Sequence, residues 1–169
     1  FPYTTLFRSQ LRYTSIWALI GGIQSLLISI VLLSCQGSTV FREFRKFENY
    51  TWERFDKITF NIPIEEEGII ADINLSIRYL EQYPYVDLPM NIILSTPSGE
   101  ERIIEKTVIM KDADGTFKGK VAGSYWDLEE LLWDNFIFNK TGNYTVEIEN
   151  LNPRPGIPAL VDIGLIVKK

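Results

Sequence analysis

The chain has 169 residues, of which 46% are hydrophobic, so it suits a single globular domain with a sizeable core and is not generally disordered. Its net charge is −5, and an acidic surface is a poor match for nucleic-acid phosphates, so we expect no nucleic-acid partner. The sequence holds one Cys and no His, which excludes an internal disulfide and removes the commonest general base and the commonest zinc ligand.

The first 34 residues have the composition of a leader rather than of a folded domain. Residues 1–9 do not begin with Met and resemble sequencing-adaptor read-through, so we set them apart as an adaptor-like scar and expect the true leader to begin upstream of Gln10. Arg12 then precedes the apolar run Ser15–Leu33, which has the character of the hydrophobic part of a signal peptide. A membrane helix that is not cleaved and a buried core helix are the alternative interpretations of this run.

The apolar run ends in a lipobox. Leu32 and Leu33 precede the small residue Ser34 and the single cysteine of the chain, Cys35. Lipoprotein processing attaches diacylglycerol to the thiol and then cuts before the modified residue, where a small side chain is needed. We therefore predict that residues 1–34 are removed, that Cys35 carries the lipid, and that residues 35–39 form a lipidated tether. Two or more acyl chains hold a protein stably on a membrane.

Residues 40–169 are predicted to form the folded domain, from short strands separated by turns. Lys57–Ile64 is the first clear strand, and Pro63 places it at a sheet edge or marks its end. Ile69–Tyr79 alternates apolar and polar residues, which is the pattern of an antiparallel strand with one buried face. Further strands are expected at 90–95, 102–110, 133–138, 144–148 and 160–167, with weaker candidates at 40–50 and 116–121.

One short helix is predicted at Trp126–Leu132. Asp127 stands at its start, and Leu128 and Leu131 fit one helical face. Together the elements predict an all-β fold, an antiparallel, jelly-roll-like β-sandwich of seven to nine strands with one short helix, preceded by the hydrophobic signal segment.

Two acidic stretches could bind a metal ion or carry catalysis. Asp112–Gly115 resembles the opening of a calcium loop, but the Glu that should follow it is missing, which favours a turn. In Glu65–Glu67, neighbouring carboxylates on an extended chain point in opposite directions and do not converge. We expect no metal, no cofactor, no small-molecule substrate and no enzymatic activity.

The aromatic residues Tyr125, Trp126 and Trp133 flank the predicted helix and are the candidate partner-binding residues. The alternative interpretation is that Trp126 and Trp133 fill the end of the sandwich. A row of exposed aromatics across one sheet would instead point to sugar binding. Aromatics that turn inward, together with an apolar patch near the tether, would point to contact with a protein partner.

A series of motifs, in their order along the chain, resembles the GldH family of gliding-motility lipoproteins of Bacteroidetes. They are Gln82-Tyr83-Pro84-Tyr85 with Leu88, Thr96–Glu100, Asp112–Lys120, the Trp-rich segment after it, Thr141–Leu151 and Val161–Val167. The resemblance covers nearly the whole mature chain and includes the leader and Cys35.

This resemblance implies a lipid-anchored, non-enzymatic accessory of the gliding machinery and of the outer-membrane secretion system tied to it. It also implies protein partners and a position in the cell envelope, at the outer membrane facing the periplasm. The alternative that we weigh against it is a carbohydrate-binding lipoprotein of a nutrient-uptake system.

Overall fold

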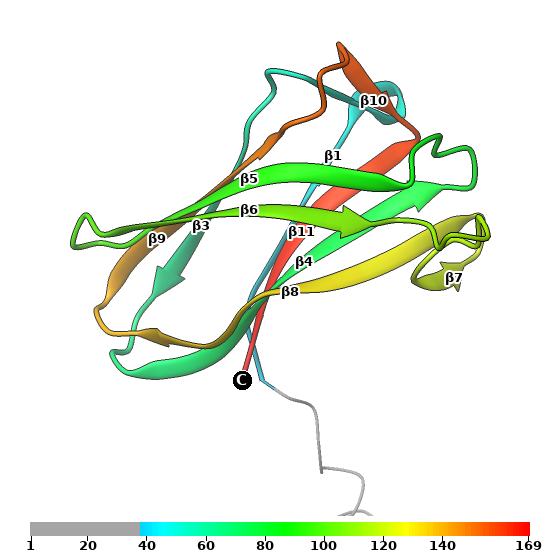
Figure 1. Cartoon of the computed structure of the whole chain (residues 1–169). Helices are drawn as coiled ribbons and strands as arrows, with labels where there is room; N and C mark the ends of the chain where they lie inside the picture. Colours follow the sequence, from blue (N-terminus) through cyan, green and yellow to red (C-terminus); the bar gives the residue numbers. More distant parts are fainter. Residues whose placement is uncertain (1–37) are drawn as a thin grey trace, which may run out of the picture. The chain divides into compact units, whose positions relative to one another are not determined.

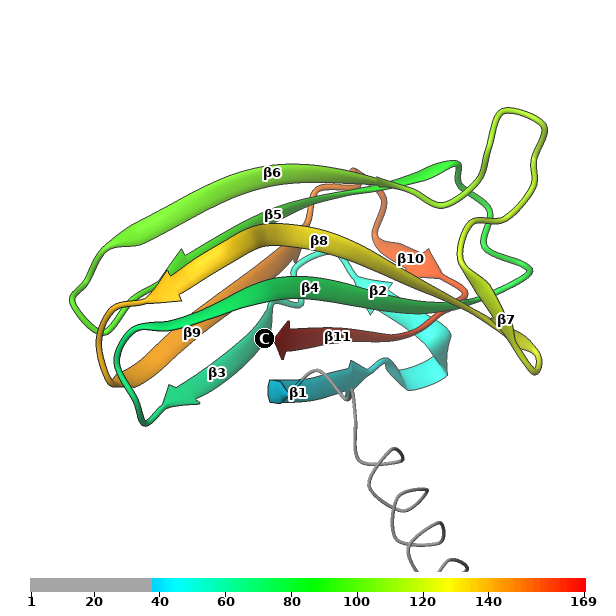
Figure 2. The same cartoon turned by 90° about the horizontal axis from the view of Figure 1, so that it is seen from below.

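The computed structural model describes residues 38–169, so the predicted leader and Cys35 lie outside the described residues. Two antiparallel sheets face each other (Figures 1 and 2). The first has five strands in the order β1 (Thr39–Lys46), β11 (Leu160–Lys168), β4 (Ile69–Leu80), β8 (Tyr125–Phe138) and β7 (Lys120–Ala122). The second has four, in the order β3 (Ile58–Ile64), β9 (Gly142–Asn150), β5 (Asp87–Ser95) and β6 (Glu101–Ile109). A separate pair is formed by β2 (Thr51–Glu53) and β10 (Gly156–Pro158).

The strand order confirms the predicted jelly-roll-like sandwich. When the three-residue strands β2, β7 and β10 are set aside, the sheets read β1-β11-β4-β8 and β3-β9-β5-β6. Each sheet thus takes its strands alternately from the two halves of the chain, as two interleaved Greek keys do. The described residues contain eleven strands, more than the seven to nine predicted, because the three-residue strands are too short to show a periodicity.

The core lies between the two sheets and follows from the alternation of the strands. In β4, the residues from Ala71 to Tyr79 on one face are at most 3% exposed, and those between them are partly exposed. Each large apolar side chain buried in this way contributes about 1.5–3 kcal/mol. The largest fully buried side chains include Trp52, Phe60, Tyr79, Tyr83, Phe138 and Tyr144.

The predicted helix at Trp126–Leu132 is wrong, because this segment is the first half of the long strand β8. β8 pairs with β4 from Tyr125 to Phe138, and the pairing is interrupted twice between Leu131 and Phe136. Asn135, in the interrupted part, has a positive φ of 48°, and its backbone N–H donates to the Asp72 carboxylate at 2.8 Å. Bulges of this kind insert extra residues into one strand and locally break its two-residue period. This explains why the spacing of the leucines imitates a helix.

Other details of the prediction stand. Pro63 lies on β3, an edge strand, where its missing N–H interrupts no ladder on the open side. Within residues 38–169 the only helical element is the short 3₁₀ turn Glu48–Tyr50, and none is long and apolar enough to cross a membrane.

Candidate functional site

The three predicted partner-binding residues lie on β8 but do not share one face. Trp126 is registered with the core residue Tyr79 and turns toward the other sheet. Tyr125, its neighbour, lies on the outer face, where the Arg78 guanidinium is 5.8 Å from its ring centroid. Trp133 lies further along the strand, and all three side chains are partly exposed. Since β7 covers β8 only as far as Asp127, the rest of β8 is a free edge that gives access to both faces.

Trp126 belongs to a set of aromatic side chains at one end of the sandwich, which we call the end cluster. Its ring packs against that of Phe117 in a tilted arrangement, 5.4 Å between centroids, and the Phe117 ring lies 6.0 Å from that of Tyr79. Tyr79 is followed by Tyr83 and Tyr85, each step measuring 5.7 Å. The end cluster joins β8 and β4 to the two loops that close this end. Trp126 is therefore part of the packing at this end of the sandwich.

Tyr79 fastens one of these loops to the end cluster. Its hydroxyl lies within hydrogen-bond distance of the carbonyl oxygens of Met110 and Lys118, which start and end the loop between β6 and β7. Burial raises the pKa of Tyr79 to about 12, so the phenol stays protonated and able to donate. The Phe117 ring in the same loop is also covered by the Lys111 ammonium group, 4.6 Å from its centroid.

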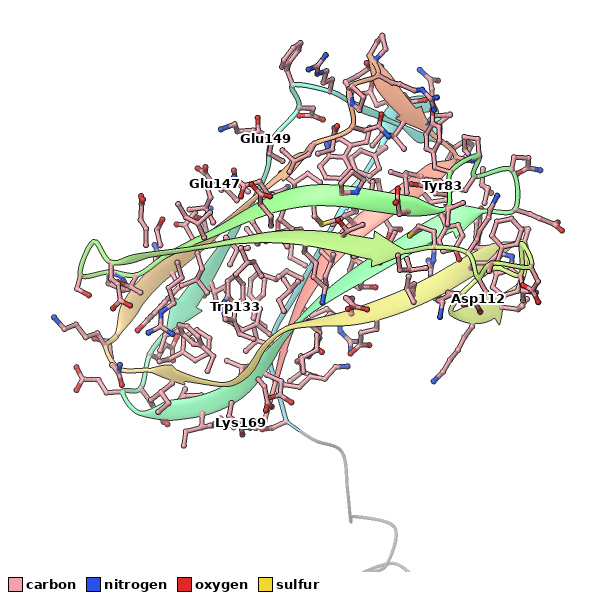
Figure 3. The ribbon with its side chains drawn as sticks, viewed as in Figure 1. Tyr83, Asp112, Trp133, Glu147, Glu149 and Lys169 are labelled. Carbon is pink, nitrogen blue, oxygen red and sulfur yellow. The ribbon has the colours of Figure 1, made fainter. Side chains whose placement is uncertain are left out.

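Trp133 lies between β6 and β8, in a region that we call the flank (Figure 3). Its ring packs edge-on to Phe136 at 6.5 Å, and the Arg102 guanidinium from β6 lies 5.0 Å above the Phe136 ring. The flank is also crossed by an ion pair between Lys106 of β6 and Glu130 of β8, at 2.6 Å. The flank is therefore closed by side chains and not by backbone hydrogen bonds, and Trp133 is part of that closure.

The outer face of the five-stranded sheet carries a row of charges that crosses all of its strands. Strand register aligns Lys120, Asp127, Arg78, Asp162 and Lys46, which alternate in sign from β7 to β1. Arg78 holds Asp127 with two hydrogen bonds of 2.7 and 2.9 Å. These two hydrogen bonds to Asp127 raise the pKa of Arg78 above its ordinary value.

A hollow of about 400 Å³ opens on this face, beside the row of charges, and we call it the outer-face hollow. It is lined by Arg42, Phe44, Ser76, Arg78, Gly119, Lys120, Asp127, Leu128, Glu129, Asp162 and Ile166. The sheet is hollowed here because Ser76 of β4 and Gly164 of β11, which lie opposite each other, have small side chains or none. Asp162 is only 4% exposed, and burial raises the pKa of its carboxyl group.

The outer face of the four-stranded sheet is different in character. Glu101, Glu105, Glu147 and Glu149 alternate with the core residues of β6 and β9, and Figure 3 shows the two residues of β9. Glu149 forms a weak ion pair with Lys57 at 3.8 Å. No aromatic side chain of β3, β9, β5 or β6 lies on this outer face. This sheet therefore offers an acidic surface and not an aromatic one.

The acidic stretches weighed as metal sites form turns. The Asp112 carboxylate pairs with Lys118 at 2.9 Å, and the backbone N–H of Thr116 donates to Asp114 at 2.9 Å. That hydrogen bond lowers the pKa of Asp114. Glu65–Glu67 forms part of the turn between β3 and β4. Among residues 38–169, no three His, Cys, Asp or Glu side chains are grouped so that they could hold a metal ion.

These observations define the class of protein: an antiparallel jelly-roll domain with one acidic and one charge-alternating outer face. Residues 39–167 match the family described as GldH lipoprotein, and the chain belongs to that family. The resemblance seen in the sequence motifs is thereby confirmed. Membership implies a lipoprotein that is anchored in the cell envelope.

Known proteins that are similar to this chain include one relative in sequence and one weak match in structure. The gliding motility lipoprotein GldH of Flavobacterium johnsoniae is 26% identical over 153 residues, which cover 85% of this chain and 93% of that protein. The crystal structure of dimeric latent PorU from Porphyromonas gingivalis has a TM-score of 0.35 and 8% identity, over 80% of this chain and 14% of that chain. A likeness as weak as the second carries no weight for function.

Proposed function

We propose that this protein is a non-enzymatic accessory of the gliding-motility machinery and its associated secretion system. In this proposal it is anchored through lipidated Cys35 at the outer membrane and faces the periplasm. The observation that carries the proposal is the family match, which spans residues 39–167 and thus the whole described domain apart from its ends. A relative of nearly the same length, named as a gliding motility lipoprotein, supports it.

The distribution of aromatic and apolar side chains supports contact with a protein. Most large aromatic rings turn inward, including those of Trp52 and Tyr83, which are fully buried. The exposed apolar pair Ile70 and Ile137, 53% and 49% exposed, lies side by side on β4 and β8. Ile70 is two residues from Asp72, and Asp72 lies opposite Lys168 of β11. Lys168 in turn lies opposite Thr39, the first residue of β1, so the apolar pair is near the predicted tether. Both features were the ones expected of an accessory that docks to a partner.

The use of the carboxylates supports a non-enzymatic role. Asp127 is bound to Arg78, and Glu130 is bound to Lys106 across the flank. Both carboxylates are thus held in ion pairs that link neighbouring strands. A glycosidase would instead need two carboxylates facing each other across the scissile bond.

We propose that the partner lies along the free edge of β8. Tyr125, Trp126 and Trp133 point to different sides of the strand, but a partner on its edge reaches side chains of both faces. Trp133 is the best placed of the three, because the flank around it is closed only by side chains. Partly exposed aromatics near a cluster of charges are common anchors of interfaces.

The test is photo-cross-linking in intact cells. The photoreactive residue p-benzoylphenylalanine replaces Trp133 in one strain and Glu147, on the opposite outer face, in a control strain. We expect the photoreactive residue at position 133 to form adducts that contain a component of the gliding or secretion apparatus. The same adducts should be absent when the photoreactive residue is at position 147. Identical adducts from both positions, or none from position 133 in a cell where the protein is anchored and abundant, would contradict docking along β8.

A further inference from the structure

We propose that the outer-face hollow is a binding site for a neutral sugar ring. This inference goes beyond the proposed function, since it concerns a different face from the edge of β8 and does not depend on the lipid anchor. It rests on three features of the hollow: a carboxylate without a partner, an exposed aromatic ring, and a balance of charges among the lining residues.

The carboxylate is that of Asp162. Within residues 38–169 it forms no hydrogen bond and no ion pair, although its residue is only 4% exposed. Arg78 and Lys46 flank it on the neighbouring strands, but Arg78 is committed to Asp127 by its two hydrogen bonds.

The oxygens of Asp162 are open to the hollow. Among the described residues, the one buried side-chain oxygen that is both enclosed and without a partner is that of Asn150, on the other sheet. Asp162 is not in that condition, and it lines the hollow. A hydroxyl group that enters the hollow can therefore donate to it, and supplies the hydrogen bond that the fold does not.

Phe44 provides the apolar part of the site. It is 43% exposed and is registered with Gly164, where any side-chain carbon would overlap its ring. The glycine thus lets the ring lie against the sheet, so that it is held in place with one side open. Gly164 is two residues from Asp162 on the same face of β11, so the ring and the carboxylate are neighbours. A flat ring next to hydrogen-bonding groups matches the apolar face and the hydroxyl groups of a sugar.

The charges of the hollow favour a neutral ligand. Its lining contains three cations, Arg42, Arg78 and Lys120, and three carboxylates, Asp127, Glu129 and Asp162. The balance gives neither an anion nor a cation a net attraction, while it supplies both donors and acceptors. A ligand with many hydroxyl groups can use both kinds, because each hydroxyl donates and accepts. The volume of about 400 Å³ lies in the range of small-molecule sites.

The experiment uses the full-length lipoprotein in lauryldimethylamine-oxide micelles, because a detergent with a sugar headgroup would compete. The probes are cellohexaose, laminarihexaose and mannohexaose, each titrated to about 10 mM and followed by calorimetry and by saturation-transfer NMR. We expect at least one to bind. Asp162→Asn and Phe44→Leu should each weaken that binding at least about tenfold, the second because leucine covers Gly164 without offering a flat ring. Glu147→Gln and Tyr50→Ala are the matched controls, and both should bind as the wild type does.

Several results would overturn the proposal. One is that none of the three sugars binds. Another is that a sugar binds equally well to the wild type and to Asp162→Asn, with both proteins melting as folded domains. A tetralysine peptide is included as the competing ligand, because an ammonium group could also pair with Asp162. If that peptide binds, loses its binding in Asp162→Asn and displaces no sugar, the hollow is a site for a cationic peptide and the sugar assignment is wrong.

Discussion

Replacing Trp126 with alanine tests whether the end cluster supports the fold. Truncation of a core tryptophan costs about 3–5 kcal/mol, and the partial exposure of Trp126 reduces that to roughly 2 kcal/mol. This figure includes the loss of the tilted ring contact with Phe117, 5.4 Å between centroids. A loss of about 2 kcal/mol lowers the melting temperature of a domain of this size by roughly 7 °C.

The measurement is thermal unfolding of the full-length protein, followed by circular dichroism in the same detergent. Phe55→Ala is the control, because Phe55 is 83% exposed and its loss should change stability by less than about 0.5 kcal/mol. If Trp126→Ala melts within a degree or two of the wild type, the end cluster contributes little to the fold. In that case Trp126 would be free to serve as a docking residue, as the sequence alone suggested. The amount of partner cross-linked through position 133 in a Trp126→Ala background then shows whether Trp126 takes part in docking.

Three further predictions concern the anchor, metal binding and the outer-face hollow. Cys35→Ser should leave an unprocessed precursor that takes up no fatty-acid analogue while its domain melts normally, and equal labelling of the variant and the wild type would refute the lipobox. Calcium and chelator should give the same melting temperature, because the loop at Asp112–Gly115 has no third ligand; calcium at a hundred times its dissociation constant would add about 2.7 kcal/mol. Burial raises the pKa of Asp162 above its ordinary 3.8, so the folded protein holds that proton more tightly than the unfolded chain and loses stability as pH rises through the raised pKa. Asp162→Asn should therefore melt higher than the wild type at pH 7, and the gap should close as the pH falls toward 3.8; a gap that does not change with pH would contradict this reasoning.

The fold class could be predicted because most strands have one buried face. In β4 the alternation runs without a break, and its bounds were found to within a residue. The strand over Trp126–Leu132 could not be predicted, because the bulge between Leu131 and Trp133 places Leu132 and Trp133 side by side as partly buried residues. Leu128, Leu131 and Leu132 have the i, i+3, i+4 spacing of one helical face. The sequence holds no local sign of these bulges, which form where Asn135 and Asp72 meet.

Tyr125, Trp126 and Trp133 stay predicted partner-binding residues, and their arrangement could not be predicted from the sequence. Neither the packing of Trp126 against Phe117 nor the opposite orientation of Tyr125 can be read from spacing along the chain. The outer-face hollow was missed entirely, because its lining comes from five strands that are distant in sequence. The useful signal was Asp162, a charged residue within the apolar strand Leu160–Lys168, which was noticed only as part of a family motif.

The two edges of the four-stranded sheet have a consequence for a protein that is held on a membrane. Copies of a lipoprotein share one plane, so they meet far more often than the same number of molecules in solution, and open strand edges would let them join into larger sheets. β3 carries Pro63, which offers no N–H to a neighbour, and β6 turns Lys106 inward, where its bond to Glu130 would have to be buried by any strand added there. These two edges therefore disfavour the joining of four-stranded sheets between copies that are crowded on a membrane.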